Sequence, residues 1–573
     1  MECCENMNEI IWQRWQKNAT NKASEDAIIH WIPGKDSIRW SFGNLFDAAK
    51  RFSVLLKSHG IKRDDVCALI IRHHPDFYPL YMGVAALGAI PAVLAYPNPR
   101  LHPDKFRQGI EGMSQRSGLD WILTEASLLA VLKPLVEQKG STIKGILLPL
   151  EQDLNAFDSR DFLLPENITD NDPFLLQHSS GTTGLQKPVL ISHSALLDHA
   201  IFYGEALKQT ESDKVVSWLP LYHDMGLIAS FHLPLIWGIP SIQINPFDWV
   251  LAPELLVEAI SKENATLAWL PNFAYNLMAD KIHDEDIEGY SLASLRMLIN
   301  ASEPIRKNSH ERFVEKFKQF GFKAKSLSTL YGMAETTMAV TQTRAGQPVF
   351  EVKVDRDELS KGRVIIANYN SNARVCVSAG QLIRGCETKL VDDNMQNLGT
   401  GMVGEIAIRS VSLFDGYRNY PEKTNAVMHD GWYFSGDIGF EILGEYFIIG
   451  RKKDTIISAG KNIYPEDIED VIGIIKGVMP GRVVAFGQDD EELGTDVLSV
   501  IAETILDGET EREHLKMDIM KAAMSIDITI TNIYLVPPRW LIKSSAGKPS
   551  RNINKERILN MEKKRKGGLN DFR

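Results

Sequence analysis

The sequence predicts an α/β protein. We expect a large N-terminal domain of parallel, doubly wound sheets with a small β-barrel-like subdomain, followed by a small, mobile α+β domain. Two observations carry this prediction. Short apolar runs rich in β-branched residues alternate with longer amphipathic stretches through most of the chain, as in strands joined by crossover helices. After about residue 375, strand-like runs follow one another with only turns between them, which favours antiparallel pairing.

The alternating pattern is found in two groups, and each predicts a parallel sheet because a helix lies between successive strands. In the first group we expect strands at 66–72, 92–96, 121–125 and 145–150, with helices over 77–87, 102–118 and 127–140. In the second group we expect strands at 215–220, 241–245, 266–271, 297–301 and 324–332.

The rest of the chain predicts antiparallel strands and then a second domain. The antiparallel strands are expected at 387–393, 404–410 and 445–451. We place the domain boundary within GRKKD, residues 450–454, so that the domains are 1–452 and 453–573. Pro465 opens a helix with Glu466 and Asp467 in its first turn, which is a typical helix start. Strands and a further helix complete a domain of roughly 120 residues.

Composition argues against several classes of protein. The net charge of −11 disfavours a nucleic-acid binder, and we interpret the basic run 563–566 as a solvated tail. Five cysteines without CxxC spacing, and an N-terminus without the apolar region of a signal peptide, predict a cytoplasmic protein. The uncharged stretches 77–97 and 226–247 contain prolines, so we expect buried helices and strands there and no membrane span.

One stretch, LLQHSSGTTGLQKPVLISHS at 175–194, places a polar loop between two apolar runs. Gly181 and Gly184 allow the backbone to approach a ligand closely. Hydroxyl and backbone N–H groups can bind phosphate oxygens, and Lys187 adds a positive charge. The loop lacks the Walker A pattern, and a polar connecting turn is the alternative. The hydroxyl candidates are Ser179, Ser180, Thr182 and Thr183.

Four further stretches carry candidate binding residues. Glu335 in YGMAETT is a hard oxygen ligand suited to Mg²⁺. Asp437 in YFSGDIG, which we place after a strand, can accept two ribose hydroxyls. Arg451 lies in GRKKD, and Lys548 lies on the Gly-containing loop KSSAGKPSR. Each of these residues alone is also compatible with a structural role.

Together and in this order, these motifs resemble the adenylate-forming superfamily of acyl-CoA synthetases, adenylation domains and luciferases, over nearly the whole chain. The resemblance implies ATP and Mg²⁺ as cofactors, with the 179–187 loop at the β- and γ-phosphates. It implies that Glu335 holds Mg²⁺, that Asp437 and Arg451 bind the ribose, and that Lys548 reaches the carboxylate and the α-phosphate.

The resemblance also implies further roles, with catalysis resting on Lys548, Glu335 and Thr182. The small domain is expected to rotate about Lys453. In one respect the chain departs from the family, because Ala334 stands where many members have a threonine; Thr336 lies close by and is included in the ATP site. The residues implied to enclose adenine are Tyr331, Ala301 and Ser302.

The stretches WLPLYHDMGLI, PNFAYNLM and GKNIYPEDIE resemble the fatty acyl-AMP ligase branch of this superfamily. The apolar surroundings suit an alkyl chain. His223 and Asp224 are candidates for the entrance of the acyl pocket, with a satisfied loop pair as the alternative. Residues 346–380 coincide with the insertion of that branch, and they contain strand-like runs at 348–354 and 362–369.

In that branch the insertion is associated with stopping at acyl-AMP and passing the acyl group to an acyl-carrier protein. We therefore expect a fatty acyl-AMP ligase that acts on a fatty acid and uses the phosphopantetheine thiol of a carrier protein as acceptor. Two alternatives remain open. One is an acyl-CoA synthetase, and the other is a non-catalytic protein that binds a nucleotide or an acyl group and regulates a partner.

Overall fold

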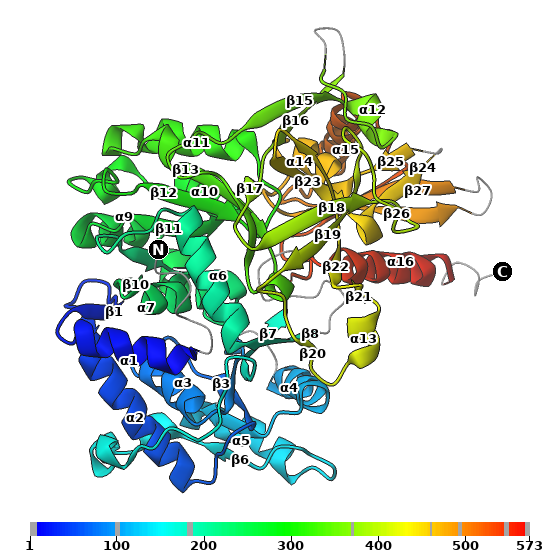
Figure 1. Ribbon diagram of the computed structural model, residues 1–573. Helices are drawn as coiled ribbons and strands as arrows, with labels where there is room; N and C mark the ends of the chain where they lie inside the picture. Colours follow the sequence, from blue (N-terminus) through cyan, green and yellow to red (C-terminus); the bar gives the residue numbers. More distant parts are fainter. Residues whose placement is uncertain are drawn as a thin grey trace.

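The computed structural model of the chain describes residues 9–97, 103–179, 187–367, 372–458, 461–490, 495–543 and 549–567. Two helix-flanked sheets make up the first part of the chain, a mainly antiparallel sheet follows, and the C-terminal part packs beside that sheet (Figure 1).

The largest sheet has the strand order β17-β14-β13-β12-β11-β9-β10-β1-β2. Its six central strands, from β13 to β1, pair in parallel; the sequence predicted five of them, β9 to β13, and did not predict β1. Strands β2, β14 and β17 add antiparallel edges. The strands are β1 (Asp26–His30), β2 (Ile38–Ser41), β9 (Val215–Ser217), β10 (Ser241–Gln243), β11 (Leu267–Pro271), β12 (Met297–Ala301), β13 (Leu327–Gly332), β14 (Ala339–Gln342) and β17 (Gln381–Leu382).

Helices flank this sheet and bury their apolar faces towards it (Figure 1). Among them, α10 packs against α11 and α6 packs against β14. The helices are α1 (Ile11–Asn21), α6 (His193–Ala206), α7 (Leu233–Trp237), α8 (Pro246–Leu251), α9 (Glu254–Glu263), α10 (Asn272–Lys281) and α11 (Lys307–Phe317).

A second sheet, of order β4-β3-β5-β6, is parallel throughout, as predicted. Every residue of α3 is buried, so the uncharged stretch 77–97 is a core helix followed by a core strand. The described residues form no helix with the length and apolar character needed to cross a membrane. The elements are β3 (Val66–Ile70), β4 (Ile90–Val93), β5 (Trp121–Thr124), β6 (Gly145–Leu147), α2 (Phe42–Ser58), α3 (Phe77–Ala86), α4 (Pro103–Ser117) and α5 (Ala126–Glu137).

The polar loop is bracketed by the antiparallel strands β7 (Pro173–Ser179) and β8 (Lys187–Ser192). Strand β20 (Gly416–Tyr417) pairs with the other edge of β8. After β8, the Ser192 hydroxyl accepts a hydrogen bond from the Ala195 N–H (3.3 Å) and caps α6.

A five-stranded antiparallel sheet contains β18 (Cys386–Val391), β19 (Gly404–Ser410), β21 (Met428–His429), β22 (Trp432–Ile442) and β23 (Glu445–Arg451). Near it lies the short helix α13 (Pro421–Asn425). The placement of Asp437 after a strand was wrong, because Asp437 lies inside β22 and is paired with Arg451 of β23. Gly436 has a φ of 72°, which lets β22 bend while its pairing continues on both sides.

The insertion 346–380 forms a hairpin-like unit of β15 (Glu351–Asp355), α12 (Arg356–Ser360) and β16 (Ala373–Val377). The first expected strand-like run corresponds to β15. The second was wrong over its described part, 362–367, which makes only isolated bridges, one of them between Ile366 and Val354 of β15. The unit packs on Phe440, Phe447 and Tyr464.

The C-terminal part contains a hairpin, β24 (Ile456–Ser458) and β25 (Lys461–Ile463), and a sheet of order β26-β27-β28. Most of its buried apolar residues between Ile456 and Ile558 form two clusters, whereas Tyr464 packs with Phe440 and Phe447. The division at 452/453 stays a proposal. The other elements are α14 (Pro465–Gly473), β26 (Val483–Asp490), β27 (Thr495–Glu503), α15 (Glu509–Met524), β28 (Asn532–Val536) and α16 (Arg551–Gly567).

Candidate functional site

Glu335 is held by a tight turn between β13 and β14. It lies in a short 3-10 helix, η8 (Ala334–Thr336), directly after the end of β13. Gly332 has no room for a side chain, because a Cβ there would lie 1.7 Å from the Met338 carbonyl oxygen. Thr337 has a positive φ of 64°. The turn buries Glu335, which is only 7% exposed.

The hydroxyl of Thr336 is used within the same turn. It donates to the carbonyl oxygen of Met333 at 3.0 Å. It therefore stabilises the turn, and it does not replace the hydroxyl that Ala334 lacks. Its place in the ATP site stays a prediction.

Tyr331, Asp437 and Arg451 come together from three different strands. The Tyr331 hydroxyl donates to Asp437 Oδ2 at 2.9 Å, and Arg451 Nε lies 3.1 Å from Asp437 Oδ1. The charge of Asp437 raises the pKa of the Arg451 guanidinium. Burial, with the charge of Asp437 as a further cause, raises the pKa of Tyr331. A buried, fixed carboxylate of this kind can accept hydrogen bonds from a diol.

Lys187, Tyr417 and Glu335 form a second group beside the first. Lys187 Nζ donates to the Tyr417 hydroxyl at 3.0 Å, and that hydroxyl donates to Glu335 Oε1 at 2.7 Å. Burial lowers the pKa of Lys187, with the charge of Glu335 acting in the opposite direction. Burial raises the pKa of Tyr417, and the charge of Glu335 adds to that effect. Lys187, the first residue of β8, therefore belongs to this group.

The turn that contains Ala301 and Ser302 follows β12. Ser302 has a φ of 68°, and its hydroxyl contacts the Met225 sulfur at 3.8 Å. The next residue, Glu303, accepts a hydrogen bond from the Phe273 N–H at 2.8 Å. This turn therefore joins the carboxyl ends of β11 and β12, where ligands bind in sheets of this type.

The base of the loop that carries Lys548 lies beside this turn. Lys543 and Pro549 form an antiparallel bridge across that loop. Burial lowers the pKa of Lys543 to about 8, and one opposing contribution comes from the charge of Glu303 in the large domain. Arg306, which follows the same turn, forms an ion pair with Asp470 of α14. This ion pair is a further contact with the C-terminal part.

The predicted acyl region begins with a helix of π type, η4 (Met225–His232). His223 Nδ1 lies 2.6 Å from Asp224 Oδ1, and Asp224 accepts from the Met225 N–H at 2.7 Å. These contacts correspond to a satisfied pair that caps η4; an additional role at an acyl entrance stays a prediction. Gly226 is required here, because a Cβ would lie 2.3 Å from the Pro220 carbonyl oxygen.

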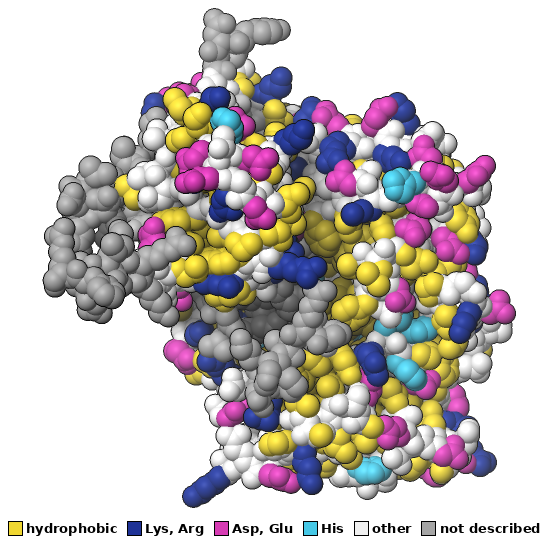
Figure 2. Space-filling model, turned by 180° about the vertical axis from the view of Figure 1, so that it is seen from behind, with side chains coloured by type: hydrophobic (Ala, Val, Ile, Leu, Met, Phe, Trp, Pro, Cys, Tyr) yellow, Lys and Arg dark blue, Asp and Glu magenta, His cyan; other side chains and the backbone are white. Residues whose placement is uncertain are grey.

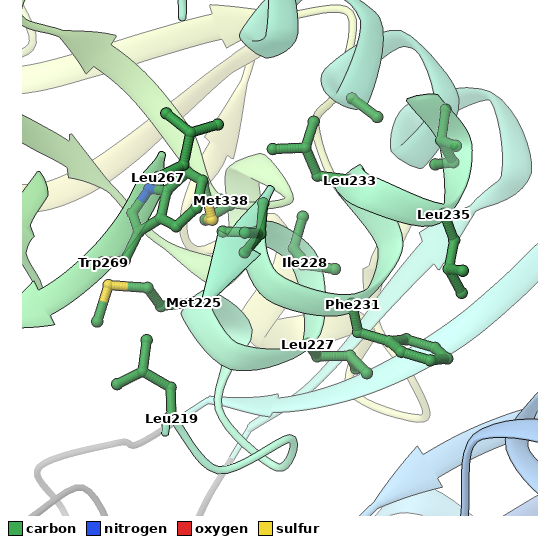
Figure 3. Packing of buried hydrophobic residues seen from close by; sticks show 14 of the residues in the cluster. Leu219, Met225, Leu227, Ile228, Phe231, Leu233, Leu235, Leu267, Trp269 and Met338 are labelled. Carbon is green, nitrogen blue, oxygen red and sulfur yellow. The ribbon is translucent and has the colours of Figure 1, made fainter. Parts of the chain in front are cut away.

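Apolar and aromatic side chains surround η4. In Figure 3, Met225 of η4 lies between Trp269 above it and Leu219 below it. Trp218, directly after β9, stacks on Trp249 with ring centroids 3.6 Å apart. On the face seen in Figure 2, hydrophobic side chains border a central hollow. Such a lining suits an alkyl chain.

Several predicted residues lie outside the part of the chain that the structure describes. These are Ser180, Gly181, Thr182, Thr183, Gly184 and Lys548. For Ser179 the structure describes the backbone alone, as the last residue of β7. Lys453 lies in the 3-10 helix η9 (Lys452–Asp454), between β23 and β24.

Sequence reasoning missed Tyr417 and Glu303. Tyr417 stands in DGYRNYPE, and nothing there separates a site tyrosine from a core tyrosine. Glu303 stands two residues after Ala301 in NASEP, which was considered only as an adenine turn. In the sequence, only the position of Glu303 next to that turn could have suggested a role in the site.

The chain is similar to several known proteins. Residues 15–418 match the model of the family described as AMP-binding enzyme. A protein of Mycobacterium tuberculosis named "Probable long-chain-fatty-acid–AMP ligase FadD30" is 28% identical over an alignment of 577 residues, which covers 93% of this chain and 95% of that protein. The medium-chain-fatty-acid–[acyl-carrier-protein] ligase JamA of Moorena producens is 27% identical over 546 residues, covering 91% and 90%.

A solved structure has the same fold. It is the fatty acyl-adenylate ligase of L. pneumophila in complex with acyl adenylate and pyrophosphate, with 26% identity, a TM-score of 0.74 and coverage of 96% of both chains. The family model itself covers well over half of the chain. This protein therefore belongs to the AMP-binding enzyme family.

Proposed function

We propose that this protein is a fatty acid–AMP ligase, which joins a fatty acid to the AMP part of ATP, releases pyrophosphate and passes the acyl group to an acyl-carrier protein. The observation that carries the proposal is the convergence of Lys187, Glu335, Asp437 and Arg451. Four separate segments bring them to one site. The turn after β12, the strand paired with β13, contacts η4 through Ser302 and Met225.

The residues fit the chemistry of this reaction. A fatty acid carboxylate attacks the α-phosphorus, the bond to the bridging oxygen breaks, and pyrophosphate leaves. Because two anions must be aligned, the protein has to supply positive charge and fixed donors, and a protein nucleophile is not required. Lys187 and Arg451 supply charge, and Asp437 can hold the ribose. Lys548 would act on the carboxylate and the α-phosphate.

Glu335 is our candidate ligand for Mg²⁺. Among the described residues, no group of three or more possible ligands could hold a metal ion by itself. A single buried carboxylate fits Mg²⁺ in this setting, since Mg²⁺ is commonly bound by one or two carboxylates together with substrate phosphates. When bound, the ion would neutralise phosphate charge.

Two observations support an acyl-carrier protein as the acceptor of the acyl group: the name of a relative, and the contacts that the insertion makes. JamA carries the name of a ligase that acts on an acyl-carrier protein. In this chain, Arg356 and Arg374 of the insertion both contact Asp467 of α14, at 3.3 and 2.6 Å. We infer that these contacts restrain the rotation of the small domain about Lys453, so that transfer to free coenzyme A is slow.

The experiment is mass spectrometry of the products formed from ATP, Mg²⁺ and a panel of fatty acids, with no acceptor, with coenzyme A, or with holo-carrier protein. We expect acyl-AMP without an acceptor and acyl transfer to the carrier. Efficient acyl-CoA formation would instead identify an acyl-CoA synthetase. Absence of both acyl-AMP and pyrophosphate with every acid would favour a non-catalytic regulator.

A further inference from the structure

The hydroxyl of Tyr417 lies between the two charged groups that would face the phosphates of ATP. We propose that Tyr417 is a positioning residue: it orients Glu335 for Mg²⁺ and holds Lys187 beside that carboxylate before ATP binds. This inference rests on the proposed function only for the identity of the nucleotide and the metal.

The fold fixes Tyr417 in place. It pairs with Val189 of β8, two residues after Lys187, so the lysine and the tyrosine lie on neighbouring strands. The Tyr417 N–H donates to the Thr424 hydroxyl at 2.9 Å. The Tyr417 ring also makes an edge contact with Phe414, with centroids 4.9 Å apart. Tyr417 is only 3% exposed, so its hydroxyl has little freedom to turn elsewhere.

The hydrogen-bond pattern assigns a role to each partner. A tyrosine hydroxyl has one proton to donate and lone pairs with which to accept. Here the proton goes to Glu335 Oε1 (2.7 Å), and the lone pair accepts from Lys187 Nζ (3.0 Å). The lysine ammonium also lies 4.6 Å from the centroid of the tyrosine ring. Tyr417 therefore holds a cation and an anion close together without a direct ion pair between them.

This arrangement leaves part of the carboxylate available. Within the described part of the chain, Glu335 Oε2 accepts no hydrogen bond, whereas Oε1 is fixed by Tyr417. Mg²⁺ demands near-ideal ligand geometry, so a carboxylate that is already oriented binds it at a smaller entropic cost. Loss of the hydroxyl should therefore weaken the Mg²⁺-dependent part of ATP binding.

The test is Tyr417→Phe. This substitution removes the hydroxyl and keeps the aromatic ring that Lys187 contacts. Equilibrium binding of ATP is measured with Mg²⁺ and with EDTA, without a fatty acid. We expect the affinity gain that Mg²⁺ confers to fall about tenfold or more, as for a lost hydrogen bond to a charged group. The Mg²⁺ concentration for half-maximal acyl-AMP formation should rise similarly. Tyr420→Phe, on the same segment, is the matched control and should change neither quantity.

A double-mutant cycle separates positioning from a general structural effect. If Tyr417 acts through Glu335, Tyr417→Phe should have no further effect on the Mg²⁺-dependent gain in a Glu335→Gln background. The proposal is overturned if Tyr417→Phe weakens ATP binding equally with Mg²⁺ and with EDTA, or if its effect persists in that background. Failure of the proposed function would differ, because wild-type protein would then bind ATP and form no acyl-AMP.

Discussion

Replacing Arg374 tests whether the insertion restrains the small domain. Arg374 lies in β16 of the insertion and is 8% exposed. Its guanidinium contacts Asp467 at 2.6 Å, the Ile449 carbonyl oxygen at 3.4 Å and the face of the Tyr464 ring at 5.5 Å from the centroid. Arg374→Ala removes one partner of this buried pair and leaves Arg356 beside Asp467.

Removing one member of a buried ion pair typically costs about 3–5 kcal/mol, and the remaining Arg356 contact favours the lower figure. A loss of about 3 kcal/mol in domain docking corresponds to a roughly 100-fold shift between domain orientations. If this contact slows the rotation of the small domain into the orientation for acyl transfer, acyl-CoA formation from free coenzyme A should rise by up to that factor. Acyl-AMP formation needs the orientation in which Arg374 contacts Asp467, so the rate of acyl-AMP formation should not rise.

The assay compares initial rates of acyl-CoA and acyl-AMP formation in wild type, Arg374→Ala, Asp467→Ala and the double variant. Arg363→Ala is the matched control, because Arg363 pairs with Glu358 inside the insertion and is half exposed. Urea unfolding identifies variants that fail to fold. The reasoning is refuted if a folded Arg374→Ala protein forms acyl-AMP normally and gains no acyl-CoA activity over the Arg363→Ala control.

Three further predictions concern the site itself. Asp437→Ala should weaken ATP binding by about 1.5–3 kcal/mol in calorimetry, as for lost hydrogen bonds to a charged group, and should leave fatty acid affinity nearly unchanged; unchanged ATP affinity would remove the ribose assignment. Lys548→Ala should lower kcat for acyl-AMP formation at least as much as kcat/KM in a folded protein, and an unchanged rate would exclude Lys548 from the mechanism. Burial lowers the pKa of Lys543 to about 8. The rate of its reductive methylation, measured by mass spectrometry at a series of pH values, should therefore reach half its maximum near pH 8. A midpoint near 10, as for ordinary lysines, would contradict the buried position of Lys543.

The strands of the smaller parallel sheet and five central strands of the largest sheet followed from hydrophobic periodicity, because a core element needs apolar residues at regular spacing. The placement of Asp437 did not follow. Gly436 and Asp437 are typical turn residues, but pairing of β22 with β23 overrides that local preference. The π geometry of η4 was also beyond sequence reasoning, since its apolar residues fit an ordinary helix equally well.

The candidate site was predictable where a motif marks it, as for Glu335, Asp437 and Arg451. Contacts between distant segments were not predictable. Tyr417 joins the site because β20 adds to β8, and Arg374 meets Asp467 because the insertion folds back on α14. A lone tyrosine or arginine gives no signal of such a partner, since only the tertiary fold brings the two residues together.

Exchange of labelled pyrophosphate into ATP tests the central claim most directly, because it requires reversible formation of an acyl-adenylate and no acceptor. With Mg²⁺ and a panel of fatty acids and amino acids, we predict exchange that depends on a fatty acid and is absent with every amino acid. Absence of exchange with any fatty acid, or exchange with amino acids alone, would contradict the assignment of this protein as a fatty acid–AMP ligase.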